Sequence, residues 1–172
     1  TVTSGREANP VVTEGNLSIA TFNVLNYFNG EVTDSGEVTF DYDANRGAED
    51  ETEFALQEGR IVEAIVGLNA DVVGLMEIEN DGFGDDSAIQ ALVTAINAEL
   101  AEEEQYTFVS TADSSIIGTD AITVGLLYRA SVVVPAGDAQ IVDMPIQQID
   151  EDSVAQMRAA LVQTFTHVES EK

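Results

Sequence analysis

The chain has 172 residues, of which 32 are Asp or Glu and only 6 are Lys or Arg, so its formal net charge at pH 7 is −26. A hydrophobic content of 44% is enough for one domain with a real core and excludes a wholly disordered chain. The charge excludes a protein that binds nucleic acid through a basic surface. No apolar run approaches the roughly 18 residues that cross a membrane, and the absence of cysteine leaves the redox compartment open.

Two compatible interpretations of the charge remain open. An acidic surface with a single lysine stays soluble in salt water or brine, where screening reduces self-repulsion, and this predicts a halotolerant protein. Alternatively, the carboxylates bind divalent cations that bridge the protein to a phosphate group.

In chain order, the polar residues 1–16 are interpreted as a linker. The apolar run 17–23 predicts a buried strand. Residues 29–50 form an acidic segment without apolar periodicity, which predicts a loop with at most a short hairpin around 37–40.

Two helices are predicted on either side of a second strand, which runs from Asp71 to Glu77. The first begins near Asp50, which with Glu53 forms a cap. Ser87 and Gln90 form a capping box that opens the second helix. The expected apolar faces are Phe54, Ile61, Ile65 and Leu68 in the first helix, and Ile89, Leu92, Val93, Ile96 and Leu100 in the second.

The remaining sequence predicts strands at 106–110, 121–129, 132–134 and 162–167, and a weaker helix at 152–159. This order of elements predicts an α/β protein with a mixed sheet and helices on its outer faces.

The first two predicted strands each end in a polar residue that a packed strand does not need, Asn23 and Glu77. Burying a carboxylate without a partner costs several kcal/mol, so one at a strand end indicates either solvent or a bound cation.

The segments around these residues resemble the endonuclease/exonuclease/phosphatase superfamily of metal-dependent phosphodiesterases, and most of all its secreted bacterial nuclease branch. The similar segments cover most of residues 17–167 and follow the family's order. They are Asn-Val-Leu-Asn-Tyr-Phe at 23–28, Arg-Gly-Ala at 46–48, Met-Glu-Ile-Glu-Asn-Asp-Gly at 76–82, and Gly-Thr-Asp-Ala-Ile-Thr-Val-Gly-Leu-Leu-Tyr-Arg at 118–129.

The resemblance implies a DNase-I-like αββα sandwich of two mixed sheets with outer helices, of which residues 17–172 supply the N-terminal half. It implies that Glu77 and Asn23 are catalytic and bind Mg²⁺ or Mn²⁺, with Ca²⁺ as a further candidate, and that Arg129 contacts the phosphate backbone. Each residue also has a structural alternative: Asn23 could tie a strand end to a loop, Glu77 could be solvated, and Arg129 could pair with an acid. Glu79 is either solvated or a support to Glu77.

The family's Asn-His, Gly-Asp-hydrophobic-Asn and Asp-His motifs have no counterpart in the 172 residues. The single histidine, His167, is expected to be a strand-edge residue rather than a general base. The resemblance therefore implies a secreted, DNA-hydrolysing parent protein with no membrane partner. This chain alone is expected to be inactive, and its exposed apolar face to be covered by the missing C-terminal half or a self-associated copy.

Alternatives within the superfamily are a phosphatase or a lipid phosphodiesterase. The alternative from another class is a non-catalytic acidic extracellular module that binds calcium. Residues 41–45 begin like a calcium loop, but Arg46 replaces the required Gly and Thr52 the bidentate Glu, so only a loose calcium site is expected there.

Overall fold

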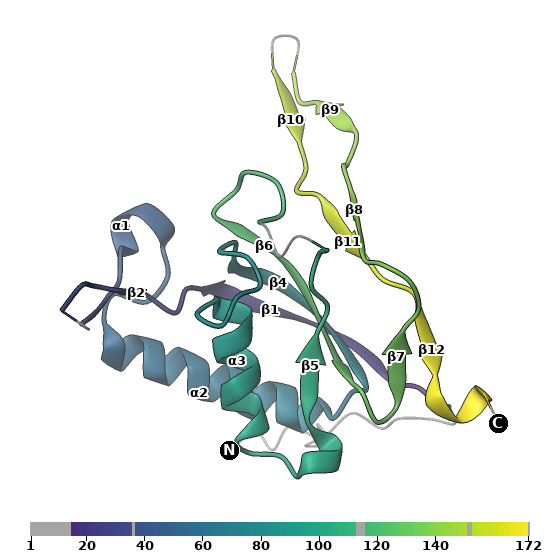
Figure 1. Ribbon diagram of the computed structural model, residues 1–172. Helices are drawn as coiled ribbons and strands as arrows, with labels where there is room; N and C mark the ends of the chain where they lie inside the picture. Colours follow the sequence, from purple (N-terminus) through teal and green to yellow (C-terminus); the bar gives the residue numbers. More distant parts are fainter. Residues whose placement is uncertain (1–14, 36, 113–115, 151–152, 172) are drawn as a thin grey trace, which may run out of the picture.

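A four-stranded mixed sheet forms the centre of the protein, in the order β1-β4-β6-β5 (Figure 1). The computed structural model describes residues 15–35, 37–112, 116–150 and 153–171, so most of the expected linker lies outside the described residues. β1 and β4 are parallel, whereas β6 is antiparallel to both of its neighbours. The strands are β1 (Ile19–Tyr27), β4 (Val72–Glu79), β5 (Tyr106–Phe108) and β6 (Ile122–Arg129).

The two predicted helices are confirmed as α2 (Glu51–Leu68) and α3 (Ala88–Asn97). Asp50 caps α2, because its Oδ1 accepts a 2.9 Å hydrogen bond from the Glu53 backbone N–H. Ser87 caps α3 in the same way through the Gln90 N–H at 3.4 Å. The capping box is only half formed, since the Gln90 side chain donates to Thr94 Oγ1 instead of reaching back to Ser87.

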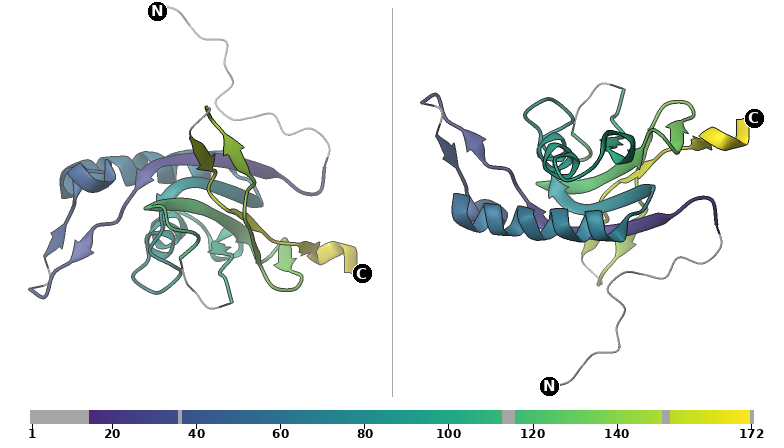
Figure 2. Two further views of the ribbon diagram at one scale, coloured as in Figure 1. Left: turned by 90° about the horizontal axis from the view of Figure 1, so that it is seen from above. Right: turned by 90° about the horizontal axis from the view of Figure 1, so that it is seen from below.

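Both helices contribute to one apolar core against the same face of the sheet (Figures 1 and 2). Gly125 on β6 permits this approach, because a Cβ there would lie 2.9 Å from the Ile89 Cδ1 of α3. Burying each large aliphatic side chain stabilises the fold by roughly 1.5–3 kcal/mol. The fully buried members include Val24, Tyr27, Val73, Leu75, Ile78 and Leu127 from the sheet and Ile65, Leu92 and Ile96 from the helices.

A long two-stranded arm projects from the sheet and returns to it (Figures 1 and 2). It consists of three successive antiparallel ladders that pair β7 (Val133–Pro135) with β12 (Phe165–His167), β8 (Gln140–Val142) with β11 (Ala160–Val162), and β9 (Ile146–Gln148) with β10 (Val154–Gln156).

The base of the arm touches β6, where the Tyr128 and Phe165 rings lie 5.2 Å apart. The rest of the sheet face opposite the helices is less covered, and Ile19 on β1 and Met76 on β4 are 69% and 39% exposed.

The acidic segment contains the expected short hairpin, β2 (Glu31–Val32) paired with β3 (Val38–Thr39), followed by one turn of helix, α1 (Tyr42–Asn45). Short 3₁₀ turns occur at Glu102–Glu104 and Val168–Glu171. None of the helices in the described part of the chain has both the length and the apolarity needed to cross a lipid bilayer.

Three predictions require correction. The helix expected at 152–159 is wrong: among its described residues, Val154–Gln156 form β10, because ladder pairing with β9 outweighs a weak local helix preference. The strand expected at 162–167 is divided between β11 and β12. Both helices cover one face of the sheet rather than its two outer faces. The described residues thus form a mixed α/β structure with one central sheet and small antiparallel hairpins.

Candidate active site at the carboxyl edge of β1 and β4

Asn23 and Glu77 lie at the same edge of the sheet, because β1 and β4 are parallel and both residues are near the strands' carboxyl ends. Asn23 pairs in register with Met76, and the next register pair is Tyr27 with Ile78. Between these pairs, three residues of β1 face only Glu77 of β4. The ladder is therefore interrupted on both strands where the predicted site residues meet.

Backbone strain is concentrated at this edge. Glu77 has φ 64°, and Leu25, Asn26 and Arg46 have φ values of 57°, 51° and 55°. These are four of the five non-glycine residues with positive φ among the described residues, and the fifth, Asn69, ends helix α2. Left-handed backbone at such residues costs of order 1–3 kcal/mol each and is often found at functional sites.

Side-chain amides hold the strained segment of β1 in place. The Asn26 Nδ2 donates to the Arg46 carbonyl oxygen at 3.3 Å. The Gln57 Nε2 of α2 donates to the carbonyl oxygens of Val24 and Leu25 at 3.1 and 2.7 Å. The two Gln57 bonds give the carbonyl oxygens of the interrupted stretch of β1 a donor from α2.

The Asn23 side chain stabilises the bulge and keeps donor capacity. Its Oδ1 accepts a 2.7 Å hydrogen bond from the Leu25 N–H, which agrees with the structural alternative of an amide that ties a strand end to the next segment. The Nδ2 protons have no hydrogen-bond acceptor among the residues that the structure describes. The half-exposed Glu77 carboxylate makes no hydrogen bond or ion pair with any residue that the structure describes.

The Glu77 carboxylate suits a partly hydrated cation, in which water and substrate complete the coordination, rather than a site built wholly from protein ligands. No group of three or more His, Cys, Asp or Glu side chains in the described ranges could hold a metal ion. Mg²⁺ commonly keeps several waters and binds one or two carboxylates together with a substrate phosphate, which the uncommitted Glu77 carboxylate suits. Four of the five residues of the loose calcium site expected at 41–45, Tyr42–Asn45, form α1, and calcium binding there stays a prediction.

An acidic pocket of about 450 Å³ lies next to this edge. The carboxylates of Glu31, Asp41 and Glu79 line it together with the rings of Phe28 and Phe40. Glu79 is therefore not simply solvated. Burial, and then the nearby Asp81 and Glu31 carboxylates, raise its pKa to about 7, against the opposing effect of the Asn29 N–H that donates to Glu79 Oε2 at 3.3 Å.

A second pocket, of about 480 Å³, lies between β1, the Arg46 segment and α2, and we call it the arginine pocket. Arg46, Arg60 and Asn23 line it, and Gly47 and Ala48 border both pockets. Neither arginine is predicted from the sequence as a site residue: Arg46 enters only as part of a similar segment and as a departure from a calcium loop, and Arg60 does not enter at all. The scarcity of arginine in so acidic a chain was the available signal.

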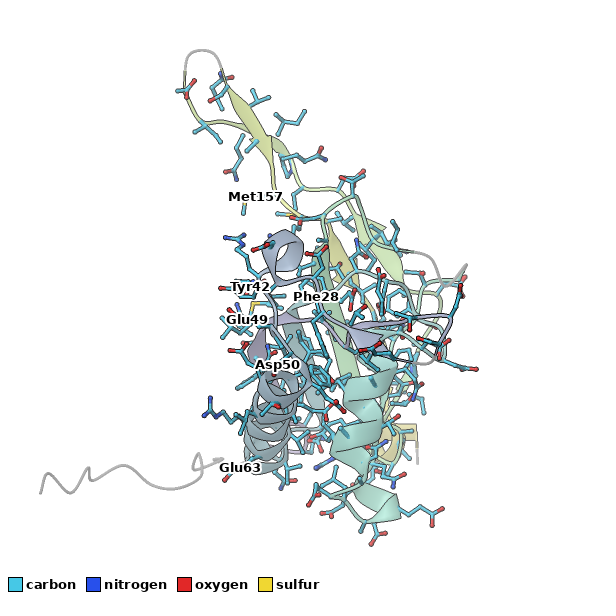
Figure 3. All side chains as sticks on the ribbon, turned by 90° about the vertical axis from the view of Figure 1, so that its left-hand side faces the viewer. Phe28, Tyr42, Glu49, Asp50, Glu63 and Met157 are labelled. Carbon is cyan, nitrogen blue, oxygen red and sulfur yellow. The ribbon has the colours of Figure 1, made fainter. Side chains whose placement is uncertain are left out.

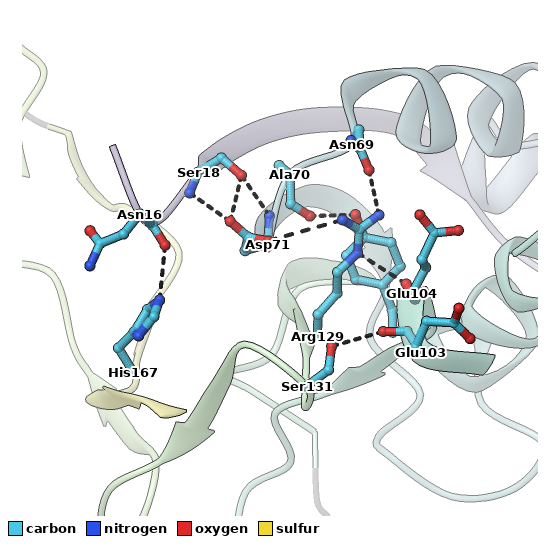
Figure 4. A network of polar contacts seen from close by, with 11 residues as sticks. Asn16, Ser18, Asn69, Ala70, Asp71, Glu103, Glu104, Arg129, Ser131 and His167 are labelled. Carbon is cyan, nitrogen blue, oxygen red and sulfur yellow. Dashed lines mark hydrogen bonds and ion pairs between the residues drawn. The ribbon is translucent and has the colours of Figure 1, made fainter. Parts of the chain in front are cut away.

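The structure does not bring Arg129 to this edge (Figure 4). Tyr128 pairs with Val72 and the Arg129 N–H donates to the Asp71 carbonyl oxygen at the amino end of β4, so Arg129 lies roughly 20 Å from Glu77 along the strand, at about 3.3 Å per residue. Its guanidinium is buried, with 7% of the residue exposed.

Every part of the Arg129 guanidinium has a structural partner. Its Nε donates to the Glu104 carbonyl oxygen at 3.0 Å and its Nη2 to Asn69 Oδ1 at 2.8 Å, and it lies 4.9 Å from the Tyr106 ring centre. Its Nη1 is 4.0 Å from Asp71 Oδ1. The structural alternative, an arginine paired with an acid, describes these contacts.

His167 is the last residue of β12 and lies near the amino ends of β1 and β4, opposite the candidate site (Figure 4). This position agrees with the expected strand-edge residue. Its Nε2 lies 2.9 Å from the Asn16 carbonyl oxygen, and its Nδ1 accepts from the Glu169 N–H at 3.2 Å. Both ring nitrogens are engaged, as in an imidazole with its proton on Nε2.

Comparison with models of protein families and with curated proteins gives no match for this chain. The residues and their geometry are therefore the basis for a functional assignment.

Proposed function

We propose that this chain is the N-terminal portion of a divalent-metal-dependent phosphodiesterase, a secreted nuclease that hydrolyses DNA. The observation that supports it most is the interrupted β1–β4 ladder, which puts the uncommitted Glu77 carboxylate beside the Asn23 amide. Strained backbone is often found at functional sites, and here the same interruption also keeps Val24 and Tyr27 of β1 on the core face.

The two side chains have different tasks in this proposal. Glu77 binds the cation, Mg²⁺ or Mn²⁺, which when bound polarises a phosphoryl oxygen of the substrate. Asn23 donates a hydrogen bond from Nδ2 to a phosphate oxygen and adds no charge. The bulges fix both groups before substrate arrives, which lowers the cost of orienting them.

We also propose that the sheet and its two helices are the N-terminal half of an αββα sandwich. Its support is the sheet face opposite the helices, where Ile19 and Met76 are exposed. In the proposal, the C-terminal half of the domain or a second copy of the chain covers this face.

Metal binding tests the site directly. We expect calorimetry with Mg²⁺ or Mn²⁺ to show weak binding to the wild-type chain and much weaker binding to Glu77→Gln. Glu63→Gln, an exposed change on α2, is the matched control and should bind as the wild type does. Equal heats from Glu77→Gln and the wild type would remove Glu77 as a ligand. Calcium binding insensitive to this substitution would favour the non-catalytic calcium-binding module.

Plasmid nicking tests the reaction. We expect residues 1–172 to show no useful nicking with Mg²⁺ or Mn²⁺, because each missing general-base or charge-stabilising group contributes about 10²–10⁴-fold. A longer protein carrying the downstream motifs should nick DNA, and Glu77→Ala should abolish most of that activity. EDTA-sensitive nicking by residues 1–172 alone would refute the claim that the catalytic apparatus is incomplete. Release of phosphate from monoesters or lipids without nicking would favour the other superfamily activities.

A further inference from the structure

The arginine pocket is unusual in its electrostatics. Four arginines lie in the described part of the chain, and two of them pair with acids: Arg129 with Asp71 at 4.0 Å, and Arg158 with Asp120 at 2.8 Å. Arg46 and Arg60 form no ion pair with any described residue, although the chain has 32 acidic residues. Both unpaired guanidinium groups line the same pocket.

One carboxylate also lines this pocket, that of Glu53. Its Oε2 accepts a 2.8 Å hydrogen bond from the Glu49 backbone N–H at the start of α2, so it is held by the helix end. Two guanidinium groups and one carboxylate leave a local charge of +1, in contrast to the three carboxylates of the neighbouring acidic pocket. Charge of opposite sign thus lies on the two sides of Gly47 and Ala48.

We infer that the arginine pocket binds a phosphate group of the substrate strand, with Arg46 and Arg60 supplying the charge and Asn23 an amide donor. Guanidinium groups suit phosphate because their fixed N–H donors match its oxygens. The nucleic-acid part of this inference rests on the proposed function, whereas binding of a phosphoester anion rests on the pocket alone.

The size and walls of the pocket favour a nucleotide over a free phosphate ion. Its volume of about 480 Å³ lies within the range of small-molecule sites, roughly 300–1,000 Å³. Phe22, Leu56 and Ile61 supply apolar walls. The Tyr42 ring on α1 also lines it and is 44% exposed, so it is available to stack on a base.

The position of the pocket links it to the candidate metal ligand. Asn23 lines the pocket and pairs in register with Met76, the residue before Glu77. Figure 3 looks onto this side of the molecule, where Tyr42 lies above Glu49 and Asp50 at the start of α2. A phosphate held in this pocket would therefore lie on the Asn23 side of the candidate site, one register step from Glu77.

Binding of small phosphoesters in EDTA tests the pocket without any contribution from a metal. The probes are thymidine 3′,5′-bisphosphate, inorganic phosphate and glycerophosphocholine, followed by NMR or calorimetry on residues 1–172. We expect thymidine 3′,5′-bisphosphate to bind most tightly, and Arg46→Gln or Arg60→Gln to weaken it about tenfold each, as the loss of a charged hydrogen bond predicts. Arg60→Lys, which keeps the charge, should recover part of the loss.

Arg158→Gln is the matched control, because it removes the same charge from an exposed arginine outside the pocket. It should bind the probes as the wild type does, and circular dichroism should show that all variants are folded. Equal weakening by Arg158→Gln and Arg60→Gln would overturn the inference, since it would mean a general charge effect. Tighter binding of glycerophosphocholine than of the nucleotide would overturn the nucleotide assignment.

The inference and the proposed function can fail separately. Nucleotide binding that depends on Arg46 and Arg60, in a longer protein that does not nick DNA, would support the pocket and refute the nuclease. Nicking that is as strong in Arg46→Gln and Arg60→Gln as in Arg158→Gln would support the nuclease and overturn the role of the pocket.

Discussion

Asn23 and Glu77 are offset by one register step on neighbouring parallel strands, and the ladder is interrupted on both strands where they meet. Glu77 has left-handed backbone there, at φ 64°, although a strand residue normally has negative φ. A substitution that relieves this conformation at Glu77 should therefore stabilise the protein and weaken metal binding.

The strain at Glu77 can be measured by comparing two substitutions. Glycine tolerates positive φ and alanine does not, so Glu77→Gly should have a free energy of unfolding about 1 kcal/mol higher than Glu77→Ala. Both variants should lose Mg²⁺ binding. Urea denaturation gives the comparison, and equal stabilities would show that the backbone at Glu77 is not strained.

Arg129 is expected to be structural. Replacing it with Met removes the hydrogen bonds to Asn69 and to the Glu104 carbonyl oxygen and should lower the free energy of unfolding by about 2–4 kcal/mol. Arg158→Met breaks only an exposed pair and should cost less than about 1 kcal/mol. Binding of thymidine 3′,5′-bisphosphate by folded Arg129→Met should equal that of the wild type, and weaker binding would restore Arg129 as a substrate contact.

The raised pKa of Glu79 predicts a pH dependence of stability. Its pKa is about 7 in the folded chain, mainly through burial, and near the ordinary 4.5 in the unfolded chain. The folded chain therefore holds the proton where the unfolded chain releases it. This contribution to stability is fully present below about pH 4.5 and is lost as the pH rises to about 7.

Glu79→Gln tests this effect because it keeps the shape of the side chain and cannot ionise. The thermal midpoint of the variant minus that of the wild type should increase from pH 4 to about pH 7. Above about pH 7 this difference should stay constant. A constant difference across the whole range would contradict a raised pKa.

The net charge of −26 predicts that salt stabilises the protein. Screening reduces repulsion among the acidic side chains, and the Debye length falls to roughly 3 Å at 1 M salt. Thermal midpoints should therefore rise between low salt and about 1 M NaCl. A flat or falling midpoint would show that specific ion pairs outweigh the repulsion.

Helix ends and helix faces could be predicted from the sequence, because each depends on residues a few positions apart. The Asp50 and Ser87 caps and most of the apolar faces of α2 and α3 follow from spacing over a few residues, and the structure confirms them. In α2, Val62 rather than the expected Leu68 belongs to the core. The meeting of Asn23 and Glu77 could also be predicted, because both end apolar strands and parallel strands share a carboxyl edge. The roles of Glu77 as a metal ligand and of Asn23 as a phosphate donor stay predictions.

Pairing between segments decided the rest. Val154–Gln156 form a strand because Ile146–Gln148 pair with them across a hairpin, and the helical pattern expected at 152–159 does not include that partner. Arg129 is buried against Asn69 and Tyr106, far from Glu77, because β6 is antiparallel to β4 and carries its end to the opposite edge. Arg46 and Arg60 share a pocket because α2 packs along β1, so two cations separated by 13 residues meet in space while their positions in the sequence give no sign of it.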